Sequence, residues 1–285
     1  LTSNWCFNHP PCRIQRMSSM NRLPLDFVLL IPCYTNQNGL LTSLKSISYP
    51  PEKFEVLIID DGSTVPVNEK ELQDQLKGVV IRVHRLEKNK GIVHALNTGL
   101  NLLRSRKDVN YVARLDAGDT CHEQRFLKQV EFLNVHADVA LLATWARFQS
   151  TTSTAGYDYI TETTQAEILK EMHYKCSFIH PSVMFRKAVL DTIGVYPENY
   201  PHAEDYAFFW KIIKSYQGAV LAEKLVQISY SDKNVSAENY KKQLRSRKKV
   251  VKKFGTSSLH QLIGIGMLNL KLLLPKRIIQ KLKTE

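Results

Sequence analysis

The pattern that most constrains the fold is a short, mainly apolar run that is repeated along the chain. Residues 27–31 and 55–59 are such runs, and a third, 111–115, leads into Asp116 and Asp119. Continuous apolar runs of this length are typical of parallel strands that are covered on both faces. The chain is therefore expected to form a parallel sheet with helices on both sides.

Helices are predicted between these runs, which gives the β-α-β-α alternation of a doubly wound sheet. After Phe148 the alternation breaks, and residues 149–155 are predicted to form a flexible Ser/Thr-rich loop at the active site. A final pair of strands is expected within residues 220–230. The predicted helices are 38–48, 68–76, 91–104, 124–136, 165–173, 187–193 and 203–216.

Acidic residues gather at the ends of these elements. Right-handed crossovers place the ends of parallel strands on one edge of a sheet, where ligands of open α/β folds bind. Carboxylates gathered there are costly unless a cation or polar ligand is bound, and two of them can share Mg²⁺ or Mn²⁺. Each pair alone could equally be a turn or a helix cap. The three pairs are Asp60–Asp61, Asp116 with Asp119, and Glu204–Asp205.

Positive charge is concentrated near the C-terminus. Of the 39 Lys and Arg residues, 13 lie within 239–284, which contains no Asp or Glu, so the net charge of +12 belongs to this region. A basic tail on a neutral body favours acidic lipid over nucleic acid as the partner. Residues 259–274 are apolar but fall short of the roughly 18 residues that span a membrane. They are expected to lie in a membrane interface, the alternative being a hairpin packed on the body.

The termini and the cysteines set further limits. Residues 1–22 follow no period and lack the apolar segment of a secretory signal, so they are expected to be a disordered leader outside the fold. The five Cys residues are odd in number and have no zinc-binding spacing. This usage favours a reducing compartment without a disulfide framework.

Six stretches together resemble the motifs of family 2 glycosyltransferases with the GT-A fold. Each stretch is modest alone, but six in the family's order are specific. The resemblance implies a GT-A catalytic domain over 23–235, with a nucleotide-sugar half (23–120) and an acceptor half (121–235), followed by a basic amphipathic helical tail (236–285). The stretches are IPCYTN (31–36), IIDDGST (58–64), NKGIVHALN (89–97), ARLDAGD (113–119), HPSVMFR (180–186) and EDY (204–206).

The resemblance implies roles on the donor side. Asp61 would accept hydrogen bonds from the nucleotide base, the alternative being a cap for the next helix. Pro32 and Tyr34 would line the base pocket, although Pro32 could simply end a strand. Asn89 and Gly91 would lie near the nucleotide, and Gly91 could equally be a plain helix start.

Asp116 and Asp119 resemble the DXD-type element, in which one acid meets the ribose and the other a divalent metal on the diphosphate. The family often has a third acid where Gly118 stands, so the sequence leaves open which Asp carries the metal, and Asp119 is favoured. Arg114 could pair with the diphosphate or with Asp116. The metal, Mn²⁺ or Mg²⁺, would offset the charge of the leaving group.

Glu204 and Asp205 resemble the family's ED motif. Asp205 is predicted to be the general base that takes the proton of the acceptor hydroxyl while that oxygen attacks C1 of the donor sugar, which inverts the anomeric centre. Glu204 is the weaker candidate, and capping of the helix is the alternative for both. His180 and Arg186 match a family segment that faces the site, where they could contact phosphate or acceptor.

These features together predict a metal-dependent inverting glycosyltransferase. It would move a sugar from a UDP-, GDP- or dTDP-sugar to a glycan or lipid-linked acceptor in cell-surface polysaccharide or O-antigen synthesis. It would be cytoplasmic and peripheral at the inner face of the membrane, held through its basic tail. One alternative is a nucleotidyltransferase, but that class has a basic Gly-rich phosphate loop, and residues 31–36 do not contain one. The other is a non-catalytic nucleotide-sugar-binding protein on the same fold.

Overall fold

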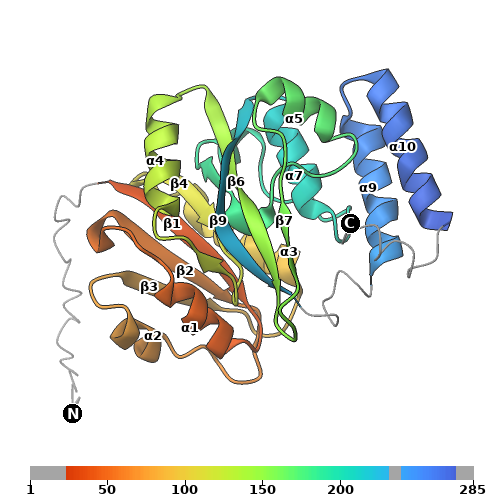
Figure 1. Ribbon diagram of the computed structural model, residues 1–285. Coiled ribbons are helices and arrows are strands. Elements are labelled where there is room, and N and C mark those ends of the chain that lie inside the picture. Colours follow the sequence, from red (N-terminus) through yellow and green to blue (C-terminus); the bar gives the residue numbers. More distant parts are fainter. Residues whose placement is uncertain (1–23, 231–238, 274–285) are drawn as a thin grey trace, which may run out of the picture.

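The computed structural model describes residues 24–230 and 239–273, which are organised around one curved sheet (Figure 1). β7 (Gly156–Tyr159) pairs only with β6 and is not part of the continuous strand order given next. Along the sheet the strand order is β3 (Val80–Arg85), β2 (Phe54–Asp60), β1 (Leu25–Cys33), β4 (Val109–Arg114), β8 (Met184–Arg186), β6 (Val139–Ser150), β9 (Gln217–Tyr230) and β5 (Thr120–Cys121).

The first half of the sheet is parallel and the second half is mixed. β1 pairs in parallel with β2 and β4, and β2 with β3. β8 is antiparallel to both β4 and β6, whereas β6 and β9 are parallel. The predicted α/β class with a Rossmann-like, mostly parallel sheet is confirmed.

Two local predictions are corrected. The final strand pair expected within residues 220–230 is a single strand, β9, of 14 residues. Of the predicted loop at 149–155, residues 149 and 150 continue β6, and only 151–155 form the turn of the β6–β7 hairpin. The alternation of apolar and polar residues was too weak there to reveal a hairpin.

Helices cover both faces of the sheet because successive strand side chains point to opposite sides. Phe27, Leu29 and Ile31 of β1 belong to one core, and Val28 and Leu30 to the other. The first core is closed by α1 (Gln37–Lys45), α2 (Glu69–Gln75) and α4 (Arg125–Val135). The second is closed by α3 (Ile92–Arg104), α5 (Gln165–Glu171), α6 (Val189–Thr192) and α7 (Glu204–Ile213).

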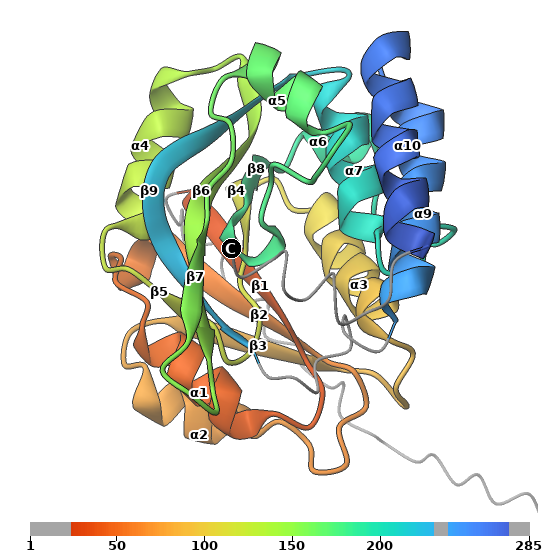
Figure 2. The ribbon, with the colours of Figure 1, turned by 45° about the vertical axis from the view of Figure 1, so that its right-hand side comes forward.

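The basic C-terminal segment forms two helices, α9 (Tyr240–Phe254) and α10 (Ser258–Leu273), which lie side by side next to α7 (Figures 1 and 2). Leu244, Val250 and Val251 of α9 are fully buried in the second core. α9 is therefore packed on the sheet domain through its apolar face. The predicted leader at 1–22 and the basic residues 276–283 lie outside the described residues.

No helix within 24–230 or 239–273 is long and apolar enough to cross a membrane. Cys33, Cys121 and Cys176 are free thiols.

Candidate active site

The carboxyl ends of β1 and β2 meet at the start of α3, as the crossover rule predicts. The Asp61 carboxylate accepts hydrogen bonds from the backbone N–H groups of Lys90 and Gly91, both at 2.9 Å. Gly62 has φ +68°, and a Cβ atom there would lie 2.4 Å from the carbonyl carbon of Lys88. Only glycine permits this close approach of the two loops. Asp61 thus orders the loop that begins α3, which leaves the second lone pair of each oxygen for a ligand.

The other residues predicted on the donor side surround this junction. Gly91 has φ +90° and is the N-cap of α3, so its helix-start role is observed. Tyr34 is 51% exposed after the end of β1, Pro32 is half-buried, and Asn89 is exposed. A hollow of about 250 Å³ lies beside them, lined by Thr35, Asn36, Gln37, Asn38, Ser63, Val65 and Val67.

Arg114, at the end of β4, is fully buried and makes two short side-chain hydrogen bonds. Its Nη1 donates to the carbonyl of Leu30 at 2.6 Å, and its Nη2 donates to Oδ1 of Asp116 at 2.6 Å. Burial of Asp116 opposes its ionisation, but the Arg114 guanidinium outweighs this and lowers the pKa of the carboxyl. Of the two predicted roles for Arg114, the structure shows the pairing with Asp116.

Asp119 lies on the same turn in a different environment. It is 5% exposed, and its Oδ1 accepts a 3.0 Å hydrogen bond from the backbone N–H of Ser229 in β9. Burial, and then the negative charge of Asp116, raise the pKa of the Asp119 carboxyl to about 8. The two carboxyls of the predicted DXD-type element therefore differ in protonation.

Gly118 is required by the backbone of this turn. Its φ is +111°, a conformation that only glycine adopts without strain, and its N–H donates to Ser43 Oγ at 2.8 Å. The turn is also held by Asn36, whose Nδ2 donates to the carbonyl of Ala117 at 2.8 Å. A third acid at position 118 would be strained in this turn.

His180 stands between the acids and the second core. Its Nε2 lies 3.4 Å from Nε of Arg114 and 2.9 Å from the hydroxyl of Tyr196. Burial and the nearby Arg114 lower the pKa of His180 to about 3. The ring is therefore neutral at pH 7, and because Arg114 donates to Nε2, its proton is on Nδ1.

Asp205 is in the first turn of α7. Its Oδ1 accepts a 2.7 Å hydrogen bond from the backbone N–H of Tyr206. Burial, and then the adjacent Glu204, raise the pKa of Asp205 to about 7. Glu204 is 8% exposed and does not line the cavity; burial also raises its pKa, and its Oε2 has no hydrogen-bond partner within the described ranges.

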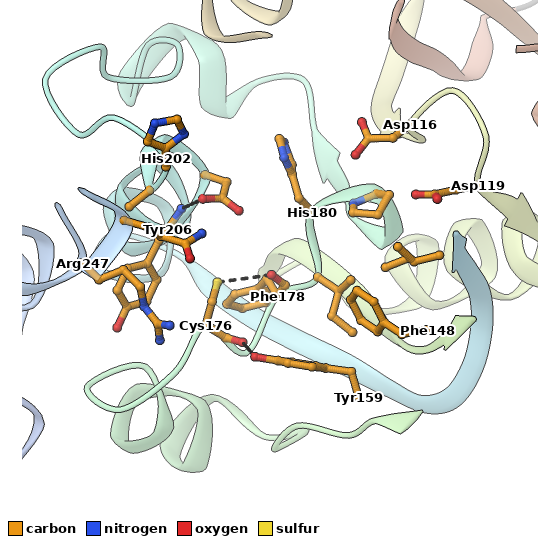
Figure 3. Close-up of a pocket in the computed structure, with 16 residues that line it drawn as sticks. Asp116, Asp119, Phe148, Tyr159, Cys176, Phe178, His180, His202, Tyr206 and Arg247 are labelled. Atoms are coloured by element: carbon orange, nitrogen blue, oxygen red, sulfur yellow. Dashed lines mark hydrogen bonds between the residues drawn. The ribbon is translucent and has the colours of Figure 1, made fainter. Parts of the chain in front are cut away.

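A cavity of about 320 Å³ brings these groups together (Figure 3). Asp116, Asp119, His180 and Asp205 line it, although they come from three separate parts of the chain. Aromatic side chains of Phe148, Tyr159 and Phe178 line it as well, and so do Gln243 and Arg247 of α9. The sequence did not single out these five, because aromatic residues are usually core and Arg247 is one of many cations in α9.

Arg186 is the predicted site residue that the structure places elsewhere. Its guanidinium donates to the carbonyls of Leu133, His136 and Val139, and lies 5.4 Å from the ring centroid of Tyr111. These groups are at the start of β4 and the end of α4, at the opposite end of β4 from Asp116. The prediction that Arg186 contacts phosphate or acceptor is therefore corrected: it ties the end of α4 to the sheet.

The family comparison agrees with this geometry. Residues 28–194 match the family described as Glycosyl transferase family 2. The chain belongs to glycosyl transferase family 2. The motifs that carried the resemblance up to His180 and Arg186 lie within the matched residues, whereas Glu204 and Asp205 lie just beyond them.

Relatives of this family 2 chain include enzymes with stated substrates. The UDP-Gal:alpha-D-GlcNAc-diphosphoundecaprenol beta-1,3-galactosyltransferase of Escherichia coli is 29% identical over 212 residues, which is 72% of this chain and 74% of that protein. Across the curated relatives that it matches, the chain spans from 27% to 74% of their length.

Two solved structures share the fold. S. aureus TarS 1–349 in complex with UDP-GlcNAc superposes with a TM-score of 0.64 at 19% identity, over 86% of this chain and 71% of that one. The mannosyltransferase PcManGT from Pyrobaculum calidifontis, in complex with GDP-Man and Mn²⁺, gives a TM-score of 0.60 at 14% identity, over 90% and 73%. The fold of this chain is therefore GT-A, as predicted.

Replacing Arg186 with Gln tests its structural role. The variant loses charge-assisted hydrogen bonds to three carbonyls, so the free energy of unfolding should fall by about 2–4 kcal/mol. Urea denaturation measures this loss, and a thermal shift with nucleoside diphosphates should show unchanged affinity in the folded variant. Loss of nucleotide affinity with stability intact would contradict the assignment.

Proposed function

We propose that this chain catalyses the metal-dependent, inverting transfer of a sugar from a nucleotide-diphospho-sugar to a glycan or lipid-linked acceptor. The observation that carries the proposal is the single cavity lined by Asp116, Asp119 and Asp205. The E. coli relative named above acts on a lipid-linked sugar, and the TarS and PcManGT structures hold nucleotide-sugars. The donor would be a UDP-, GDP- or dTDP-sugar.

The donor nucleotide is assigned to the junction of β1, β2 and α3. Asp61 has lone pairs free for the base, and Tyr34 presents an exposed ring after β1 that can pack against it. Pro32, Asn89 and Gly91 surround the same junction. The diphosphate would then extend toward Asp116 and Asp119, whose turn is tied to the start of α1 by Asn36.

The two carboxyls fit a divalent cation, Mn²⁺ or Mg²⁺, in two respects. Each has one oxygen in a hydrogen bond, Asp116 with Arg114 and Asp119 with Ser229, which leaves the other oxygen as a hard ligand. Burial and Asp116 raise the pKa of Asp119 despite the nearby Arg114 and Arg125, so a bound cation would favour its ionised form. Within 24–230 and 239–273 no three His, Cys, Asp or Glu side chains converge as a metal site, either here or elsewhere, so the diphosphate would have to supply further ligands.

Asp119 is the favoured ligand, because Asp116 already has Arg114 as its positive partner. When bound, the cation would stabilise the charge of the departing nucleoside diphosphate. Arg114 and the neutral ring of His180 hold Asp116 in position, either for the metal or for the ribose.

Asp205 is assigned as the general base. It removes the proton from the acceptor hydroxyl while that oxygen forms a bond to C1 of the donor sugar. The bond from C1 to the diphosphate oxygen breaks on the opposite side, which inverts the anomeric centre. A pKa of about 7 suits this role, since such a group is ionised near neutral pH and is still basic enough to accept a proton.

Asp205→Asn should reduce kcat by about 10²–10⁴-fold, because the amide cannot accept the proton. The affinity for nucleoside diphosphate should stay within about twofold, since Asp205 does not contact the donor. In the wild type, log(kcat/KM) should rise with pH up to about 7 and level off above it, as the carboxyl ionises. Steady-state kinetics from pH 5.5 to 8.5 measures this rise in log(kcat/KM). The same rise in Asp205→Asn would refute the assignment.

Asp119→Asn should abolish the metal-dependent part of donor binding. For the wild type, thermal shifts with UDP, GDP and dTDP should be larger with Mn²⁺ than without it by several degrees, as expected for ligand concentrations well above Kd. The variant should show equal shifts in both conditions, and Asp205→Asn serves as the matched control that keeps the difference. An undiminished Mn²⁺ effect in Asp119→Asn would remove this residue from the metal site.

The outer surface of the C-terminal helices supports peripheral attachment to an anionic membrane. α10 buries Gly264 and Leu268 against the body but exposes apolar side chains along its opposite side. Exposed Lys and Arg residues of α9 lie beside this surface. An apolar face next to cations suits insertion at the headgroup level of acidic lipid. The exposed apolar residues are Leu259, Leu262, Ile263, Met267, Leu270 and Leu273.

Leu262→Glu combined with Leu270→Glu should release the protein from phosphatidylglycerol vesicles in a co-sedimentation assay, because both side chains are more than half exposed on α10. Val135→Glu, on α4 and 77% exposed, is the matched control that should bind like the wild type. Binding should also weaken with rising salt. Equal binding of the double variant and the control would exclude α10 as the attachment surface.

A further inference from the structure

One cation of α9 faces inward. Arg247 lines the cavity, and its Nη2 donates to the carbonyl of Tyr174 at 3.2 Å. Its guanidinium lies 5.4 Å from the ring centroid of Tyr206, the residue that follows Asp205. Among the described residues no carboxylate lies within ion-pair distance of Arg247. The half-buried guanidinium bonds to Tyr174 and Tyr206 and has further donors left that could bind an anion.

The position of Arg247 in the cavity separates it from the donor side. Asp116 and Asp119 lie on one side of the cavity, and Arg247 with Tyr206 and Cys176 lies on the other, with His180 and Phe178 between them (Figure 3). A donor diphosphate next to Asp116 and Asp119 would therefore lie on the other side of the cavity from Arg247. An anion at Arg247 would instead belong to the molecule that presents its hydroxyl to Asp205.

The surroundings of Arg247 suit a phosphoryl group. The planar guanidinium binds phosphate oxygens through two parallel hydrogen bonds. Gln243 lies one helical turn earlier, also lines the cavity, and adds an amide donor on the same face of α9. The neighbouring polar groups Cys176 and Tyr159 are uncharged, because burial raises the pKa of both. Arg247 lowers the pKa of Asp205 but forms no ion pair with it, so guanidinium donors remain for a further anion.

We propose that Arg247, assisted by Gln243, binds a phosphoryl group of the acceptor, so that the acceptor is a sugar linked through phosphate or diphosphate to its carrier. This inference rests on the proposed transfer reaction and specifies its acceptor class. The contact would fix the distance from the phosphoryl group to the attacked hydroxyl, and so select which sugar of a carrier-linked chain reaches Asp205.

The test compares charged and neutral acceptors. Hexyl diphosphate-linked monosaccharides and the same monosaccharides as neutral hexyl glycosides are assayed by released nucleotide, with wild type, Arg247→Gln, Arg247→Lys and Arg245→Gln. Arg245 is an exposed cation on the same helix, so its variant carries the same change in charge away from the cavity. Melting temperatures confirm that each variant is folded.

For Arg247→Gln, KM for the diphosphate-linked acceptors should rise about 10- to 100-fold, as for loss of hydrogen bonds to a charged group, with kcat within about threefold. The neutral glycosides, the hydrolysis of donor without acceptor, and the Arg245→Gln variant should be unaffected, and Arg247→Lys should lie between. An equal loss on charged and neutral acceptors, or a loss of UDP affinity that would place the donor diphosphate at Arg247, overturns the proposal.

A binding measurement separates this inference from the proposed reaction. Hexyl diphosphate is titrated calorimetrically into the UDP-loaded wild type and the same variants. Weaker binding of hexyl diphosphate to Arg247→Gln than to Arg245→Gln supports a phosphoryl site at Arg247, even if none of the acceptor monosaccharides tested is a substrate. Equal binding to both variants overturns it. Failure of the wild type to bind any nucleoside diphosphate would instead overturn the proposed function.

Discussion

The active site is built on one buried cation. Arg114 has no exposed side-chain surface, and it binds the carbonyl of Leu30 in β1, the carboxylate of Asp116 and the ring of His180. Loss of the Asp116 carboxylate would leave the buried Arg114 charge without its ion-pair partner. The same guanidinium lowers the pKa of Asp116 and adds to the effect of burial in lowering the pKa of His180. Arg114 thereby links the central strand β1 to the turn that carries Asp116 and Asp119.

Three carboxyls that look alike in the sequence are made different by their neighbours. Asp116 has Arg114 beside it, and its pKa is lowered despite burial. Asp119 and Asp205 form no ion pair with any described residue, and burial together with a neighbouring carboxyl raises their pKa values to about 8 and about 7, against the smaller effects of nearby Arg side chains. Separation of pKa values by environment lets carboxyls of one cavity take different roles, as the proposed metal binding and base catalysis require.

Much of this could be predicted from the sequence, because local patterns report on buried strands. The parallel order of β1, β2 and β4, and the gathering of Asp61, Asp116 and Asp119 at one edge, follow from apolar runs and the crossover rule. The position of Arg186 could not be predicted from the sequence. Arg186 lies on β8, and the antiparallel pairing of β8 with β4 and β6 brings its guanidinium to the carbonyls of α4 and β6. Arg247 could not be distinguished from other cations of its helix, since only the packing of Leu244, Val250 and Val251 decides which side of α9 faces the cavity.

That packing gives the basic segment two separate tasks. The cations on the outside of α9 remain in water beside the apolar side of α10, where an acidic membrane would lie. Arg247, on the inner side of the same helix, reaches the cavity that holds Asp205. A carrier-linked acceptor has the same two parts, an apolar chain that stays in the membrane and a phosphoryl-linked sugar that must leave it. If both proposed contacts are made, the helix pair α9 and α10 would set the height of Asp205 above the membrane surface, because the two contacts lie on the inner and outer sides of the same pair.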